Sequence, residues 1–163
     1  MHSKSPLLKV AGEIDELLGE VISLQKDFVA RVCPSCEEPC CKRVRRLFDE
    51  KDTIFAKASG RNGVPKRSGK GERGCAFLTS TGCLLTPKAR PFICHRYLCP
   101  ALKKEMAEAD PELVKGLSER FRVLEELRVR LWKEYLKVQG ESVSDVRSGR
   151  ASRSLSEDPI SGG

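Results

Sequence analysis

The chain has few aromatic residues, only two histidines and no long uninterrupted apolar run. Aromatic residues make up 6% of its 163 residues, which gives little material for stacking on nucleic-acid bases. No apolar stretch approaches the roughly 20 residues of a membrane-spanning helix, so no membrane association is expected. The N-terminus also lacks the apolar core of a secretory signal, so the sequence predicts a cytoplasmic protein.

Motifs of common enzymes are missing as well. The sequence contains no phosphate-binding glycine loop, no dinucleotide-binding glycine pattern and no Ser-His-Asp set. Catalysis by this chain alone is therefore not expected. A methyl-transfer or redox reaction stays open as an alternative if a protein partner supplies the substrate site.

Cysteine, in contrast, is abundant and clustered. Four of the eight cysteines lie in the run Cys33-Pro34-Ser35-Cys36-Glu37-Glu38-Pro39-Cys40-Cys41, and the others are Cys75, Cys83, Cys94 and Cys99. A two-residue gap such as that between Cys33 and Cys36 lets both sulfurs reach one metal at about 2.3 Å. In a reducing cytoplasm this pattern favours metal or redox chemistry over four disulfides or a set of buried small side chains. All eight cysteines are candidate metal ligands.

The adjacent pair Cys40-Cys41 is a special case. Neighbouring side chains tend to diverge, so the two thiols either serve different metals or divide the roles of ligand and packing residue. The sequence leaves open whether there is one site or two.

The longest stretches of helical periodicity lie at the two ends of the chain. Apolar residues recur every three or four positions from Leu7 to Phe28, which predicts an amphipathic helix that stops near Arg31 because Pro34 disfavours its continuation. A second long helix is expected to start at Asp110-Pro111 and to end near Gly140. A shorter helix is predicted from Cys40 to about Ala58.

The middle of the chain has too little apolar mass to offset its ordering entropy, so bound metal is expected to stabilise it. The sequence predicts a mainly α fold: two long amphipathic helices packed on an irregular cysteine-rich metal-binding centre with little or no strand. One globular domain is expected, comprising an N-terminal helix (1–32), a metal-binding core (33–100) with a basic loop (59–74), a helical segment (101–139) and a disordered tail (140–163).

The order of these motifs resembles a known family. Cys33-x2-Cys36-x3-Cys40-Cys41 is followed by Gly74-Cys75-x-Phe77-Leu78, Gly82-Cys83-x-Leu85 and Arg90-Pro91-x2-Cys94-x2-Tyr97-x-Cys99. This arrangement is similar to the YkgJ-type cysteine-cluster proteins, and it covers about residues 33–100. The resemblance implies a CxxCxxCC domain that chelates zinc or iron, and little about substrates. One departure is the stretch from Leu84 to Ala89, where the family often has a shorter segment with a tyrosine.

The residue pattern fits either of two cofactors. A pure thiolate set without carboxylates suits a closed zinc site. Three cysteines in a tight run with a distant fourth also suit a [4Fe-4S] iron–sulfur cluster. Arg90, His95 and Tyr97 are predicted to lie around the metal, where Arg90 and His95 can hydrogen-bond its ligands. For His95 the alternatives are direct ligation of the metal and simple exposure to solvent. For Arg90-Pro91 the alternative is a surface turn.

The basic residues suggest a competing function. The formal charge is +7, but eight thiolates with two Zn²⁺ would add a net −4 and leave +3. Clustered Lys and Arg also neutralise nucleic-acid phosphates. The alternative is therefore a zinc-stabilised nucleic-acid-binding module, with its predicted contacts at Arg61, Lys66, Arg67, Lys70 and Arg73.

Overall fold

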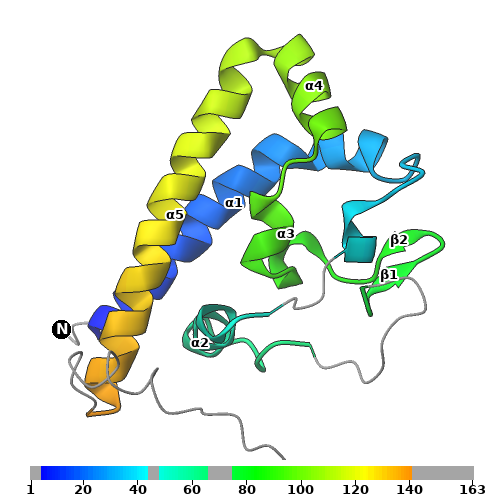
Figure 1. The fold of residues 1–163 in the computed structure, drawn as a ribbon. Coiled ribbons are helices and arrows are strands. Elements are labelled where there is room, and N and C mark those ends of the chain that lie inside the picture. The colour runs from blue at the N-terminus through cyan, green and yellow to red at the C-terminus, as the bar shows by residue number, and fades with distance from the viewer. Residues whose placement is uncertain (1–4, 44–47, 66–74, 141–163) are drawn as a thin grey trace, which may run out of the picture.

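Two long helices from opposite ends of the sequence form the frame of the molecule. In the computed structural model, which describes residues 5–43, 48–65 and 75–140, α1 (Pro6–Val32) and α5 (Pro111–Val138) lie side by side and antiparallel (Figure 1). Ion pairs between the helices, Arg120 with Glu20 and Arg130 with Glu13, fit this direction. The prediction of a mainly α fold with little strand is confirmed.

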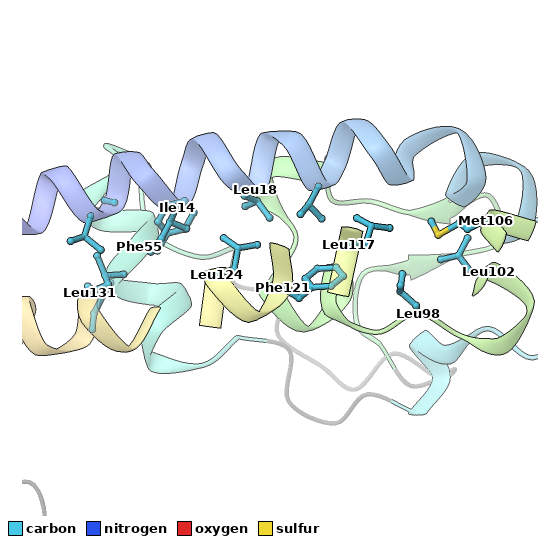
Figure 2. Packing of buried hydrophobic residues seen from close by; sticks show 14 residues of the cluster. Ile14, Leu18, Phe55, Leu98, Leu102, Met106, Leu117, Phe121, Leu124 and Leu131 are labelled. Atoms are coloured by element: carbon cyan, nitrogen blue, oxygen red, sulfur yellow. The ribbon is translucent and has the colours of Figure 1, made fainter. Parts of the chain in front are cut away.

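The apolar core lies between these two helices. One stripe of each helix is buried, and the shorter helices α2 (Glu50–Ala58) and α4 (Pro100–Ala109) add side chains at its borders (Figure 2). The core residues with the least exposure are Val10, Val21, Met106, Leu117, Leu124 and Leu131. Full burial of such a side chain stabilises the fold by about 1.5–3 kcal/mol. The helices therefore have a hydrophobic core that includes little of the cysteine-rich middle.

The helix ends follow the local sequence closely. The Asp110 side chain accepts a hydrogen bond from the Glu112 amide at 3.0 Å, Pro111 is the first helical residue, and Gly140 follows the helix with a φ of 74°. At the other long helix, α1 ends at Val32, one residue later than predicted. Cys33 keeps helical dihedral angles although it precedes a proline, and its amide still donates to the Val29 carbonyl.

The predicted helix from Cys40 to Ala58 is wrong as a single element. A short 3₁₀ turn, η1 (Cys40–Arg43), is followed after a gap in the described residues by α2, which begins only at Glu50. The reason is a capping box: the Asp49 side chain accepts from the Asp52 amide, and the Asp52 side chain accepts from the Asp49 amide. This exchange makes Asp49 the N-cap of α2, so the helix begins at Glu50.

Between α2 and α5 the described residues form a hairpin, a 3₁₀ turn and two helices of five and ten residues. A hairpin pairs β1 (Leu78–Thr79) with β2 (Gly82–Cys83) in antiparallel register. The turn η2 (Pro87–Ala89) and the short helix α3 (Phe92–Arg96) follow. Helix α4 lies in the helical segment predicted at 101–139, but its separate start was not predicted, although Pro100 at its first position is a start signal.

No helix in the described ranges is long and apolar enough to cross a membrane. The predicted tail at 140–163 lies outside the described residues except for Gly140.

Truncation of a core leucine tests this packing. Leu117→Ala removes a side chain with no exposed surface, so we expect the free energy of unfolding to fall by about 2–5 kcal/mol. Leu8→Ala is the matched control, because Leu8 is 47% exposed and its loss is expected to change stability by less than about 0.5 kcal/mol. Urea unfolding followed by circular dichroism measures both, and equal effects would contradict the assigned core.

Candidate metal centre

The cysteines occupy the ends of elements and the turns between them. Cys33 caps the C-terminus of α1, Cys36 lies in the turn that follows, and Cys40 and Cys41 begin η1. In the second group, Cys75 precedes the hairpin. Cys83 ends β2, Cys94 lies in α3 and Cys99 caps the N-terminus of α4.

The turn after α1 is fixed by backbone and side-chain hydrogen bonds. Ser35 Oγ donates to the carbonyls of Arg31 and Val32, two of the acceptors that a helix C-terminus leaves unpaired. The Cys36 amide donates to the Cys33 carbonyl at 3.3 Å. Cys33 and Cys36 therefore lie at the two ends of one tight turn.

Cys33 interacts with thiols from both cysteine groups. Burial raises the pKa of the Cys33 thiol, and the negative charges of other thiolates raise it further, in the order Cys99, Cys41 and Cys36. The pKa of Cys40, in contrast, is lowered by the hydrogen bond from the Cys41 thiol. Burial and the charges of Cys33, Cys99 and Cys94 act in the opposite direction. The structure thus brings the end of α1, the turn η1 and the start of α4 within electrostatic range.

The remaining cysteines form a second neighbourhood. The Cys75 amide donates to the Cys41 carbonyl at 3.1 Å, which ties the hairpin segment to η1. Although Cys94 is exposed, partial desolvation by the surrounding chain raises the pKa of its thiol to about 12, and the charges of Cys41, Cys75 and Cys83 contribute to that rise. Burial also raises the pKa of Cys75, assisted by the charges of Cys41 and Cys83.

Three of the sulfurs accept hydrogen bonds from backbone amides. The Sγ atoms of Cys75, Cys83 and Cys99 accept from the amides of Phe77, Leu85 and Leu102, each at 3.4 Å. Such bonds orient the sulfur atoms, and hydrogen bonds to sulfur tune metal sites. At Cys99 the acceptor also lies at a helix N-terminus, where the backbone dipole favours negative charge.

The described side chains are not arranged as a finished coordination sphere. Among them, no group of three or more His, Cys, Asp or Glu residues has its donor atoms placed to hold one metal ion. All eight cysteines are free thiols; Cys33, Cys83 and Cys94 are exposed, and only Cys75 is buried. The structure therefore gathers the thiols in one region, and their role as ligands stays a prediction.

Arg90 contributes a positive charge to the region that contains the thiols. Its charge lowers the pKa values of Cys33, Cys41 and Cys94, although burial and other thiols outweigh it at all three. The side chain is held in place because its Nε donates to the Leu85 carbonyl at 3.2 Å. This position suits the predicted role beside the ligands.

The other two residues predicted to surround the metal differ in exposure. His95 is 4% exposed, which rules out the predicted alternative of a simple surface position. Burial lowers the pKa of His95 to about 4, so the ring is neutral at pH 7. Its Nε2 donates to the Pro87 carbonyl at 3.0 Å, which leaves only Nδ1 for any ligand role. Tyr97 is 51% exposed at the end of α3.

Sequence reasoning missed the residues that hold α3 in place. Gln25, buried in the apolar stripe of α1, donates from Nε2 to the His95 carbonyl at 3.0 Å. The signal was present, because a glutamine next to Leu24 interrupts the hydrophobic pattern. Asp52 Oδ1 accepts from the Phe92 amide at 3.2 Å and from Arg128, whose guanidinium lies 4.4 Å from the centre of the Phe92 ring.

Loss of the Gln25 amide should weaken this anchor. Gln25→Ala leaves the buried His95 carbonyl without its partner, so we expect the free energy of unfolding to fall by about 1–3 kcal/mol. Gln139→Ala, at the exposed end of α5, is the control and should have an effect below about 0.5 kcal/mol. Denaturant unfolding compares the two; similar values for both would argue against the anchor.

The basic loop gives the nucleic-acid hypothesis no support within the described residues. Arg61 donates to Asp15 Oδ1 at 2.9 Å and to the Lys88 carbonyl at 2.6 Å, and it lies over the Phe55 ring. Its guanidinium is thus engaged inside the protein. The other predicted contacts, Lys66, Arg67, Lys70 and Arg73, lie outside the described residues.

Comparisons with family profiles, with curated protein sequences and with solved structures give no significant match for this chain.

Proposed function

We propose that this chain is a metal-binding protein whose clustered cysteine thiolates hold zinc or an iron–sulfur cluster, in a structural or redox role. The observation that supports the proposal most is the gathering of thiols from separate segments, together with backbone amides that donate to three of the sulfurs. Neither a disulfide nor the packing of a cysteine side chain in a core requires a backbone amide that donates to the sulfur.

Electrostatics gives a second argument. Thiols that raise one another's pKa values stay protonated when no cation compensates their charge. A thiophilic metal displaces those protons and offsets the repulsion, because the thiolate is the form that ligates. Arg90, whose charge lowers the pKa values of three of the thiols, contributes a single positive charge against eight thiolates.

The proposal is compatible with the finding that no three of the described side chains are already placed to hold one metal ion. A cysteine side chain has three staggered χ1 positions, and Cys33, Cys83 and Cys94 are exposed, so they can turn without disturbing a packed core. Structural zinc supplies about 10–16 kcal/mol of apparent binding free energy, which far exceeds the cost of changing a few rotamers.

The resemblance to the YkgJ-type family points in the same direction. It covers residues 33–100, although this chain has three residues rather than two between its second and third cysteines. The competing nucleic-acid function gains nothing from Arg61, whose guanidinium is engaged by Asp15.

Analysis of metal and sulfide in protein purified without oxygen tests the proposal. A brown sample with iron and acid-labile sulfide would identify a cluster, and a colourless sample with stoichiometric zinc would identify mononuclear sites. Ser35→Ala is the control for Cys36→Ser, since it alters the same turn without removing a thiol; only Cys36→Ser should lower the metal content. A folded protein that contains and takes up no metal would refute the proposal.

A further inference from the structure

The eight thiols have different neighbours, and the difference falls between Cys40 and Cys41. The charges of Cys33 and Cys99 act on Cys40 ahead of that of Cys94, while the backbone of Cys41 is bonded to Cys75. The charge of Cys41 also acts on Cys33, so the two groups of thiols are adjacent. Both begin the 3₁₀ turn η1, in which successive side chains point about 120° apart around the axis. Adjacent residues in such a turn are poorly placed to ligate the same small ion.

The first neighbourhood is built where α1 meets α4. These helices pack against each other, and Figure 1 shows the end of α1 beside the start of α4. Their facing ends are Cys33, the C-cap of α1, and Cys99, the N-cap of α4. Cys36 joins Cys33 through the tight turn after α1, and Cys40 lies four residues further along.

The second neighbourhood is built around the hairpin. The Cys75 amide is bonded to the Cys41 carbonyl, the Leu78 amide is bonded to the Cys75 carbonyl, and Leu78 is the register partner of Cys83. Cys94 is contributed by α3, and Figure 1 shows the short turn η1 next to the hairpin, as the bond between Cys75 and Cys41 requires. The charges of Cys41, Cys75 and Cys83 all act on the Cys94 thiol.

We propose that the chain has two adjacent four-sulfur metal sites, one formed by Cys33, Cys36, Cys40 and Cys99 and the other by Cys41, Cys75, Cys83 and Cys94. This inference rests on the proposed function and adds to it the number of sites and the ligands of each. Because Cys40 and Cys41 are consecutive in the chain, the two sites lie next to each other. Four thiolates complete a tetrahedral site for zinc and suffice for an iron–sulfur cluster.

The test is a cobalt titration of full-length protein that has been stripped of metal under reducing conditions. Co²⁺ bound by thiolates gives intense charge-transfer absorption, so each filled site is counted directly. The wild-type protein and the control Ser80→Ala, in the exposed hairpin turn, should each bind two ions. Cys36→Ser and Cys83→Ser should each bind one ion tightly.

Alkylation of the cobalt-loaded proteins, with mapping of the modified peptides, then identifies the surviving ligands. Cys36→Ser should protect Cys41, Cys75, Cys83 and Cys94, whereas Cys83→Ser should protect Cys33, Cys36, Cys40 and Cys99. A single ion in the wild-type protein overturns the partition, and so does protection of a mixed set or loss of both ions from either variant. The wild-type count needs no variant to fold. Absence of any bound ion would instead refute the proposed function itself.

Discussion

Replacing Arg128 by alanine is expected to lower the free energy of unfolding by about 3–5 kcal/mol, one of the two largest effects that the structure predicts. Arg128 is 5% exposed and donates to Asp52 Oδ1 at 2.7 Å. It also donates to both carboxylate oxygens of Asp49, at 2.8 and 2.7 Å. Removal of the guanidinium would leave the Asp52 carboxylate buried without its cation.

The cost is attributed to that stranded charge and not to the strength of the ion pair. A buried pair contributes little net stability because both ions lose hydration, but loss of one partner leaves the other uncompensated. The same change would release α3, since Asp52 also accepts from the Phe92 amide and the guanidinium covers the Phe92 ring. Arg128 thus links α2, α3 and α5.

Arg130 provides the matched control on the same helix. Its ion pair with Glu13 is exposed, with 51% of the Arg130 side chain accessible, so Arg130→Ala should cost no more than about 1 kcal/mol. Guanidinium chloride would screen these charges, so urea unfolding is the suitable measurement. A cost for Arg128→Ala as small as that for Arg130→Ala would contradict the assigned role.

If the chain binds metal as proposed, removal of that metal is expected to open the cysteine-rich middle while the long helices stay folded. The apolar core is contributed mainly by α1, α2, α4 and α5, whereas residues 75–94 add little to it. A structural site worth about 10 kcal/mol or more would therefore account for most of the order in that segment. Chelation should increase amide exchange at residues 75–94 by orders of magnitude.

Hydrogen exchange with peptide resolution makes this measurement. The internal control is the Leu117–Leu131 part of α5, whose buried leucines do not depend on the thiols and whose amides should stay protected after chelation. Equal protection of residues 75–94 with and without chelator would show that something other than metal orders the segment.

The long elements of this fold were predictable because they depend on local rules. The three- and four-residue spacing in α1 and the Asp110-Pro111 start of α5 are properties of short stretches of sequence. The single helix from Cys40 to Ala58 failed because apolar periodicity outweighed a visible signal, the Asp49 and Asp52 pair of a capping box. The start of α4 was missed because Cys99 was considered as a ligand and not as a helix cap.

The site was predictable in composition but not in arrangement. Cysteine spacing identifies candidate ligands, because two thiols of a short turn can meet one ion. Spacing does not reveal that Cys41 is bonded through its backbone to Cys75, or that Gln25 reaches the His95 carbonyl 70 residues away. Such contacts depend on how the helices pack, which only the three-dimensional structure provides.

X-ray absorption at the edge of the metal in purified, unmodified protein tests the central claim most directly. Ligation by cysteine thiolates predicts a first coordination shell of sulfur alone, at about 2.3 Å for zinc. For a cluster, the same shell of sulfur is accompanied by iron neighbours. A shell dominated by nitrogen or oxygen would contradict the account, because the metal would then lie outside the cysteine cluster.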